Sequence, residues 1–345
     1  MTEPSDGQSG RRSGRAASGG SAGAQDSRAM IAEALGVSKQ YGEEFAVRDI
    51  DLSVPEGSIF GFIGPSGSGK TTTIRLLAGI QQPTAGEITV FGKRPVDFSV
   101  TDRRRIGYMP QLSVLYPHLS LQENLNFVAS IYGMSLLRRR HLYRVLDFVE
   151  LQRHRKKLLR EASGGMQRRL ALAASLIHQP DLLFLDEPTA GIDPVLRRKF
   201  WDHFEELKSE GRTLFITTQY VGEAAYCDFI GVLADGRLLM VDTPEGVRRS
   251  AMGGELIVAV TDDQIPDEVV EALHNEPLIL SAQRNRTDGR GLELLVDEAS
   301  TAMPRLQQWF SGRELNLESI QHHQPPFDDV FVEIVNSERA GADAG

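Results

Sequence analysis

The chain has 345 residues, 41% of them hydrophobic, and a formal net charge of −9 at pH 7. A single core stops growing at roughly 250–300 residues, so about two domains are expected, with ample apolar material for each. The acidic balance argues against a nucleic-acid-binding protein, and the single cysteine, Cys227, excludes an internal disulfide framework.

Residues 1–30 are predicted to form a disordered tail, because Gly, Ser, Ala and Arg dominate the segment and leave it little to bury. The segment has no apolar region of the kind that a signal peptide carries. The chain also has no run of about 18–20 consecutive apolar residues, the length needed to cross a bilayer. A role at a membrane therefore requires a partner protein.

Residues 31–248 alternate between strand and helix patterns, which is typical of an α/β fold. The predicted elements are, in chain order, strands at 59–63 and 87–91 around a helix at 71–78, a helical insertion at about 112–178, strands at 182–185 and 213–217, and a hairpin formed by 230–233 and 237–241. The continuous apolar runs among these strands indicate a parallel sheet that is covered on both faces.

Two basic runs lie in the helical insertion, at 138–140 and 153–157. Charge runs usually lie on solvated helix faces, and we expect the same here. A contact with phospholipid headgroups or with a partner protein is the alternative.

Residues 254–336 are predicted to form a small C-terminal accessory domain. Its predicted elements are strands at 255–260, 278–281 and 291–296, and helices at 267–274 and 300–310. Their approximate order, β-α-β-β-α-β, indicates a two-layer α/β unit. A short amphipathic helix is expected at 327–334, and residues 337–345 are expected to be a disordered tail.

A glycine-rich segment follows the strand at 59–63. It reads Gly64-Pro65-Ser66-Gly67-Ser68-Gly69-Lys70-Thr71 and fits the phosphate-binding pattern G-x-x-x-x-G-K-[ST], between a strand and a helix. The glycines allow a tight turn that aims backbone N–H groups at phosphate oxygens, and the helix N-terminus adds partial positive charge. We predict that Lys70 contacts the β- and γ-phosphates, that Thr71 coordinates Mg²⁺, and that the neighbouring Thr72 also contacts the nucleotide.

Two acidic residues end the apolar strand that begins at residue 182. We expect this strand to lie beside the P-loop strand, so that Asp186 holds Mg²⁺ through water. Glu187 follows directly, where its carboxylate can polarise a water molecule in line with the γ-phosphate.

These residues and two further segments resemble the ATP-binding subunits of ABC transporters. The further segments are Ser163-Gly164-Gly165-Met166-Gln167 and Gly191-Ile192-Asp193-Pro194. The motifs match that superfamily in order and spacing from about residue 33 to 246. The resemblance implies a P-loop NTPase (RecA-like) core with a helical subdomain at about 112–178 and a small C-terminal α/β domain, and it implies ATP and Mg²⁺ as cofactors.

The resemblance also implies roles for individual residues. Tyr41 matches the aromatic residue that stacks on adenine, and Gln111 matches the glutamine that contacts Mg²⁺ and the attacking water. Ser163, Gly164 and Gly165 match the signature that binds the γ-phosphate of an ATP molecule held by the opposite subunit.

At four other positions the resemblance is instructive. Glu187 matches the general base, and Asp193 matches the loop that links the two sites of a dimer. Gln219 stands where a histidine is usual, so the expected catalytic contact to the γ-phosphate comes from an amide that can donate a hydrogen bond but cannot become cationic. Ala162 stands where the signature usually has leucine, which should alter packing rather than phosphate contact.

Among subgroups, three segments look like the drug-resistance export ATPases, of which the daunorubicin/doxorubicin type is best known. They are 217–220, 163–169 and 328–331. We therefore expect an Mg-dependent ATPase that forms a homodimer, or a pseudo-dimer with a second ATPase subunit. It would work at the cytoplasmic face of the membrane, held by a separate integral-membrane permease, and drive export of a drug, lipid or other amphipathic substrate.

The sequence also bears on three alternatives to export. A soluble ABC ATPase acting on ribosomes or DNA usually has two cassettes or a long coiled coil, and neither occurs here. An import ATPase would be expected to carry histidine in place of Gln219 and a β-rich C-terminal barrel. A binding module without catalysis is disfavoured by the intact Lys70, Asp186 and Glu187.

Overall fold

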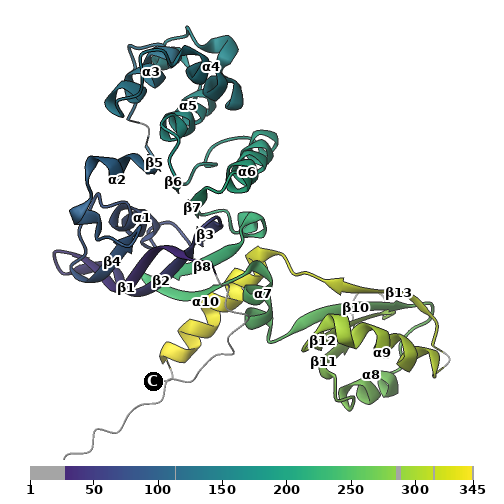
Figure 1. Ribbon diagram of the computed structural model, residues 1–345. Helices are drawn as coiled ribbons and strands as arrows, with labels where there is room; N and C mark the ends of the chain where they lie inside the picture. The colour runs from purple at the N-terminus through teal and green to yellow at the C-terminus, as the bar shows by residue number, and fades with distance from the viewer. Residues whose placement is uncertain (1–27, 113, 285–288, 314, 344–345) are drawn as a thin grey trace, which may run out of the picture.

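The computed structural model describes residues 28–112, 114–284, 289–313 and 315–343. Most of the predicted N-terminal tail, residues 1–27, lies outside the described residues. Figure 1 shows a body of two sheets that carries a group of helices at one end and a separate, smaller sheet unit at its side.

The centre of the body is a six-stranded sheet in the order β5-β6-β7-β3-β8-β9. Its strands are β3 (Ile59–Ile63), β5 (Ile106–Met109), β6 (Leu182–Asp186), β7 (Thr213–Thr218), β8 (Phe229–Ala234) and β9 (Arg237–Asp242). The first five strands of that order run parallel, and β9 pairs antiparallel with β8 as the predicted hairpin. Every residue of β3, β6 and β7 is buried, so the predicted two-sided cover and the α/β fold class are confirmed.

One predicted neighbour relationship is wrong. The strand that ends in Asp186 is predicted to lie beside the P-loop strand, but β7 lies between β6 and β3. Helical crossover connections allow a later strand to enter the sheet between two earlier ones, so strand order in space does not follow the sequence. As a result, the end of β7 contributes side chains between the acidic residues and the P-loop.

A second sheet, of three antiparallel strands, lies against helix α1 (Lys70–Leu77), which follows the P-loop. Its strands, in the order β2-β1-β4, are β1 (Met30–Tyr41), β2 (Glu44–Pro55) and β4 (Ala85–Val90). Their buried side chains share a core with α1 and with one face of the central sheet. In that core, the rings of Phe60 and Phe215 stack with centroids 5.4 Å apart, which joins β3 to β7.

The opposite face of the central sheet shares a core with α6 (Pro194–Ser209), α7 (Pro244–Met252) and the helical insertion. The insertion contains α3 (Leu121–Ile131), α4 (Arg139–Phe148) and α5 (Gly164–Leu176). The 3₁₀ helices η2 (Gln152–His154) and η3 (Leu159–Glu161) also lie in the insertion, whereas the 3₁₀ helix η1 (Pro95–Asp97) and α2 (Val100–Arg104) precede β5. The start of α3 is fixed by a capping box between Ser120 and Glu123.

The first basic run of the insertion is only partly a solvated face. Arg139 and Arg140 are exposed, whereas Arg138 is buried. Its guanidinium donates to the Asn126 side chain at 2.9 Å and to the backbone oxygen of Met134 at 2.7 Å. Arg138 therefore fastens the turn before α4 onto α3.

The C-terminal unit has the predicted β-α-β-β-α-β order and a hydrophobic core of its own. Its elements are β10 (Glu255–Thr261), α8 (Asp267–His274), β11 (Ile279–Arg284), β12 (Gly291–Val296), α9 (Ala299–Ser311) and β13 (Leu317–His323). The strands pair antiparallel in the order β11-β12-β10-β13. The fourth strand, β13, has no counterpart among the strands that the sequence analysis placed.

The last helix departs from prediction in length and in position. The sequence predicts a helix at 327–334 and a tail at 337–345, but α10 (Phe327–Asp343) continues through residue 343. It also leaves the C-terminal sheet and lies against α7 and the 3₁₀ helix η4 (Val221–Tyr226) (Figure 1). Phe327, Val330 and Ile334 are buried in the core that lies under the central sheet. The chain thus returns to its first unit after forming the accessory one.

Candidate nucleotide-binding and catalytic site

The P-loop joins β3 to α1, the strand-loop-helix order that a phosphate-binding loop requires. Two of its glycines have no room for a side chain. A Cβ at Gly64 would lie 2.1 Å from the backbone oxygen of Leu233, and one at Gly69, whose φ is +105°, would lie 2.5 Å from that of Ala46. Other residues at these positions would displace the loop.

Lys70 begins α1 and is buried. Its Nζ donates to the backbone oxygens of Gly64 and Pro65, both at 2.8 Å, so the ammonium lies within the curve of the loop. Burial lowers the pKa of Lys70, and the nearby carboxylates of Glu187 and Asp186 act in the opposite direction. A cation held in this way is placed to meet phosphate oxygens that enter the loop.

Asp186, at the end of β6, is fully buried. Its Oδ1 accepts hydrogen bonds from the hydroxyl of Thr71 at 3.2 Å and from that of Thr217 at 2.6 Å. Its Oδ2 is also buried and has no hydrogen-bond partner among the described residues. An unpaired buried carboxylate oxygen is costly, and a cation is the natural partner for it.

The oxygens of Thr71 and Asp186 fit a Mg²⁺ ion, which prefers hard oxygen ligands and commonly takes one or two carboxylates together with substrate phosphates. In the described ranges, no group of three or more His, Cys, Asp or Glu residues is suited to hold a metal ion. The donor set therefore fits an ion that arrives with a nucleotide better than one held by protein ligands alone.

Glu187 follows Asp186 in a left-handed backbone conformation, with φ of +49°. Its backbone N–H donates to both the carbonyl and the hydroxyl oxygen of Thr217, each at 3.0 Å. Its carboxylate Oε2 accepts a hydrogen bond from Nε2 of Gln111 at 3.1 Å. Two residues that the sequence analysis assigned to the hydrolytic water therefore lie in direct contact, although they are 76 positions apart in the chain.

Arg168, on the second turn of α5, is a site residue that the sequence analysis missed. Its Nη2 donates to the backbone oxygens of Asp186, at 2.9 Å, and Glu187; its Nε donates to that of Pro188 at 3.3 Å; and its Nη1 donates to that of Gln111. The only signal in the sequence is the arginine pair that follows the Ser-Gly-Gly segment, and local pattern alone does not say which backbone an arginine will reach.

Comparison with known proteins agrees with this geometry. The family model described as ABC transporter matches residues 47–190. The Nod factor export ATP-binding protein I of Cupriavidus pinatubonensis is 33% identical over 310 residues, which cover 89% of this chain and 91% of that protein. This chain belongs to the ABC transporter family of ATP-binding proteins.

Two further matches extend the comparison. The linearmycin resistance ATP-binding protein LnrL of Bacillus subtilis is 31% identical over 88% of this chain and 97% of that protein. The dimeric structure of a post-hydrolysis state of the ATP-binding cassette MJ0796, bound to ADP and Pi, has a TM-score of 0.58 and 27% identity, and the match covers 62% of this chain and 98% of that one. As a member of this family, the chain binds ATP and is an ATPase.

Some predicted site residues of this ABC ATPase lie apart from the cluster around Asp186. Tyr41, at the end of β1, is half-exposed; its hydroxyl donates to Gln81 Oε1 at 2.5 Å, and the ammonium of Lys39 lies 5.4 Å from its ring centroid. Asp193 is the N-cap of α6, where its Oδ1 accepts from the backbone N–H of Leu196 at 3.0 Å.

The signature segment of the ABC ATPase opens α5. Ser163 is exposed and caps the helix by accepting a hydrogen bond from the backbone N–H of Met166 at 3.3 Å. A Cβ added to Gly164 or Gly165 would meet no atom of the described residues within 4 Å. Ala162, in contrast, is buried in the core, consistent with an effect on packing.

The remaining predicted residues lie at the mouth of the P-loop. Pro65, Ser66 and Gly67 are exposed, Ser68 is buried with an unpaired hydroxyl, and Thr72 is half-buried. The side chain of Gln219 is exposed just beyond β7. Since Thr218 is in register with Ile63 at the end of β3, Gln219 and the P-loop both follow the carboxyl ends of neighbouring parallel strands.

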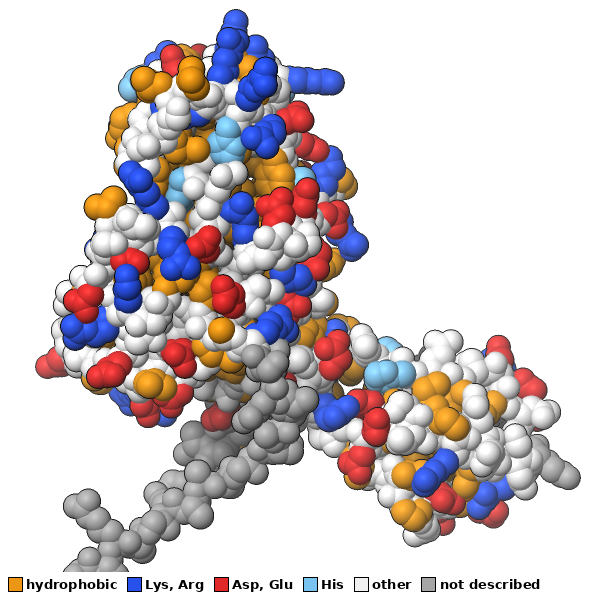
Figure 2. All heavy atoms as spheres, in the orientation of Figure 1, with side chains coloured by type: hydrophobic (Ala, Val, Ile, Leu, Met, Phe, Trp, Pro, Cys, Tyr) orange, Lys and Arg blue, Asp and Glu red, His pale blue; other side chains and the backbone are white. Residues whose placement is uncertain are grey.

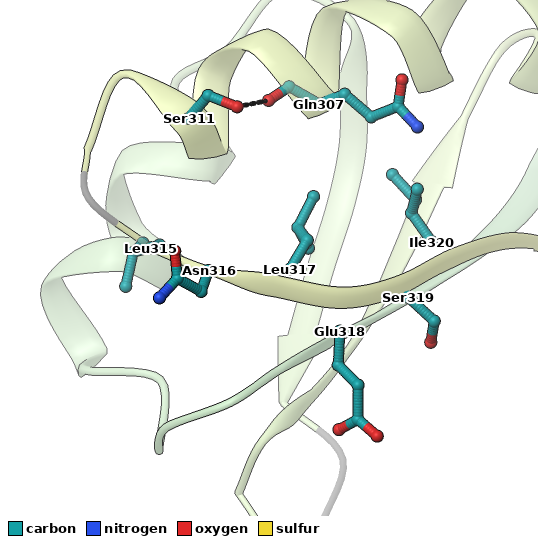
Figure 3. A pocket seen from close by; sticks show the side chains of 8 residues that line it. All are labelled: Gln307, Ser311, Leu315, Asn316, Leu317, Glu318, Ser319 and Ile320. Carbon is teal, nitrogen blue, oxygen red and sulfur yellow. Dashed lines mark hydrogen bonds between the residues drawn. The ribbon is translucent and has the colours of Figure 1, made fainter.

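A separate cavity of about 640 Å³ lies in the C-terminal unit between α9 and β13 (Figure 3). Its lining is Gln307, Ser311, Leu315, Asn316, Leu317, Glu318, Ser319 and Ile320. Glu318 is the one charged member of this lining, and no P-loop residue contributes to it. The cavity is therefore distinct from the nucleotide site and lacks the cations that a phosphate group requires.

Proposed function

We propose that this ABC ATPase hydrolyses MgATP to energise a separate integral-membrane permease that exports a drug, a lipid or another amphipathic substrate. The names of two relatives support export, since one is a Nod factor export protein and the other a linearmycin resistance protein. Both matches extend over almost the whole chain, and so include the C-terminal unit as well as the cassette. The drug-resistance subgroup suggested by the sequence agrees with this direction of transport.

The observation that carries the catalytic proposal is the cluster formed by Lys70, Asp186, Glu187 and Gln111. With ATP bound, Lys70 would contact the β- and γ-phosphates with its buried ammonium, and backbone N–H groups at the start of α1 would bind the same oxygens. Thr71 and Asp186 would hold Mg²⁺, and Gln111 would contact it. The ion, when bound, neutralises charge on the β- and γ-phosphates.

Glu187 acts as the general base in this proposal. It accepts a proton from a water molecule while the water oxygen bonds to the γ-phosphorus and the bond from that phosphorus to the bridging oxygen breaks. The hydrogen bond from Gln111 holds the carboxylate in place. Gln219, which follows the carboxyl end of β7, donates an amide hydrogen bond to the γ-phosphate. Tyr41 stacks on adenine.

A second copy of the chain, or a related ATPase subunit, would complete the site. Gly164 and Gly165 are the first two residues of α5, and packing against the described residues does not require glycine at either position, because an added Cβ would meet none of their atoms within 4 Å. Close approach of another molecule gives a reason for both glycines. Ser163 and these two residues would contact the γ-phosphate of ATP bound to the opposite P-loop, with Asp193 at the junction between the two sites.

The helical insertion carries the surface that we assign to the permease. Large apolar side chains are exposed there: Leu112, Val114, Tyr116, Phe127, Ile131, Leu136 and Leu137. Apolar side chains are visible across this end of the molecule in Figure 2. Leu137 is 94% exposed, although the neighbouring Arg138 is buried and hydrogen-bonds to the backbone of its turn. The exposed side chain therefore lies on a turn whose conformation is fixed. Exposed apolar clusters of this kind mark contact sites. In the described residues, no helix has both the length and the apolar character needed to cross a bilayer, so binding to a permease would place the chain at the cytoplasmic face of the membrane.

Three experiments test the proposal. Lys70→Ala removes the cation on the phosphates, so ATP turnover is expected to collapse in a folded protein; turnover at the wild-type rate would refute the P-loop assignment. For export, inside-out membrane vesicles that contain this chain and its permease should accumulate an amphipathic fluorescent substrate only with MgATP. Accumulation in right-side-out vesicles alone would establish import instead. Leu136→Glu with Leu137→Glu should release the chain from the permease while ATP binding persists.

A further inference from the structure

The guanidinium of Arg168 has an unusual set of partners. Its four acceptors are backbone oxygens, and three of them belong to the consecutive residues 186–188; the fourth belongs to Gln111. A guanidinium offers five N–H donors in a rigid plane, and a lysine ammonium cannot reproduce that fork. Burial lowers the pKa of Arg168, while the carboxylates of Asp186 and Glu187 favour its charged form.

The segment that Arg168 contacts is strained. A non-glycine residue with φ near +49°, such as Glu187, costs on the order of 1–3 kcal/mol and persists only where its surroundings fix it. Thr217 fixes one side of this turn, through two acceptors for the Glu187 N–H. Arg168 fixes the other side, through the carbonyls of Asp186, Glu187 and Pro188.

We propose that Arg168 is a positioning residue for hydrolysis, which holds the Glu187 carboxylate and the Gln111 amide in their catalytic arrangement without contacting the nucleotide. The inference rests on the proposed role of Glu187 as the base. Arg168 reaches the segment from α5, the helix whose N-cap is Ser163. One helix therefore carries both the proposed contact to the opposite nucleotide and the clamp on this chain's own base.

The next residue provides a matched control. Arg169 lies on the same helix, but its guanidinium donates to the backbone oxygen of Val149 at 3.4 Å and pairs with Glu150 at 3.5 Å. These partners belong to the helical insertion and not to the catalytic segment. If Arg168 served only to pack α5, then Arg168→Gln and Arg169→Gln would have similar effects.

The experiment compares Arg168→Gln, Arg168→Lys and Arg169→Gln in the full chain, with thermal melting, binding of a fluorescent ATP analogue, and kcat and KM for ATP. Misplacing a reacting group by about 1 Å can cost about 100-fold in rate, so we expect kcat to fall between about 10- and 100-fold in Arg168→Gln. Analogue affinity and KM should stay within about threefold of wild type, because the P-loop contacts are intact. Arg168→Lys should also be slow, since it retains the charge without the fork, whereas Arg169→Gln should keep kcat within about threefold.

A double-mutant cycle with Glu187→Gln separates this inference from the function on which it rests. If Arg168 acts through Glu187, then adding Arg168→Gln to Glu187→Gln should lower the residual rate by less than about threefold. Equal losses of kcat in the Arg168 and Arg169 variants, or independent losses in the cycle, would overturn the inference. So would a folded Arg168→Gln protein with wild-type kcat while Glu187→Gln is inactive. An active Glu187→Gln protein would instead refute the proposed base. If Arg168→Gln does not fold, the same comparisons are made with Arg168→Lys.

Discussion

The side-chain amide of Gln111 donates a hydrogen bond to the carboxylate of Glu187 across 3.1 Å. Gln111 lies just beyond β5 at one edge of the central sheet, and Glu187 just beyond the neighbouring β6. Since the helical insertion begins directly after Gln111, a movement of that insertion would reach the proposed base through this contact. The pair therefore connects the surface assigned to the permease with the site of hydrolysis.

Glu187→Gln should abolish rapid hydrolysis while ATP still binds. The glutamine keeps an oxygen that can accept from Gln111 but has no basic carboxylate, and loss of a general base costs about 10²–10⁴ in rate. ATP should then accumulate between two chains as a closed dimer. Light scattering with MgATP measures this directly. A variant that stays monomeric at saturating MgATP, even when its permease is present, would contradict the proposed ATP-bound dimer.

Thr217→Val, a substitution on the inner strand β7, should lower kcat. The Thr217 hydroxyl donates to Asp186 at 2.6 Å and accepts from the Glu187 N–H at 3.0 Å, so its loss removes a hydrogen bond from a buried carboxylate and leaves Asp186 Oδ1 with the longer one from the Thr71 hydroxyl, at 3.2 Å. We expect a destabilisation of about 1–3 kcal/mol, together with a lower kcat.

Thr213→Val is the control for that experiment. Thr213 begins the same strand, is equally buried, and accepts a hydrogen bond from the Gly57 N–H at 2.9 Å, far from the acidic residues. It should lower the melting temperature to a similar extent with little change in kcat. If both variants lowered kcat equally, the effect would be one of general stability.

Gln219→His should change the pH dependence of hydrolysis. The reference pKa of histidine is about 6.5, so an imidazole here would gain a proton as the pH falls through that region, whereas the native amide does not titrate. If residue 219 contacts the γ-phosphate, kcat should respond more than nucleotide affinity, with a new feature in the pH–rate profile between about 6 and 8. Gln219→Ala should lower kcat by removing the donor. Two variants identical to wild type in kcat and in pH profile would mean that Gln219 serves only to end the strand.

The return of α10 changes what a C-terminal truncation is expected to do. A chain that ends near residue 250 loses Phe327, Val330 and Ile334 from the core around α7 and η4. It should therefore be destabilised, and η4, which follows Gln219 closely, should lose its cover. Val330→Asp alone should cost about 3 kcal/mol or more, because it buries a charge at a fully buried position.

The control for the chain that ends near residue 250 is a deletion of residues 255–324 that keeps α10 and joins the ends with a short glycine linker. This is feasible because α10 lies beside α7. The shortened protein should melt near the wild-type temperature and bind ATP, unlike the chain cut near residue 250. Equal stability of the two would show that α10 contributes nothing to the ATPase core.

Sequence by itself determined the features whose geometry is local. The P-loop, the buried strands β3, β6 and β7, the β8–β9 hairpin and the β-α-β-β-α-β order follow from contiguous patterns, because backbone conformation there depends on glycine placement and on the period of apolar residues. For the same reason the sequence also supplied Lys70, Asp186 and Glu187 as candidates.

Only the tertiary structure decided which of these side chains meet. It inserted β7 between β6 and β3, and that order makes Thr217 a partner of Asp186. It carried the Arg168 fork to backbone oxygens at the ends of β6 and β5, and it returned α10 to the first unit through a stripe of buried residues that reads in sequence as an ordinary amphipathic face. The partner of a side chain or of an apolar face is set by sheet order and packing among distant segments, and neither has a signature in the local pattern.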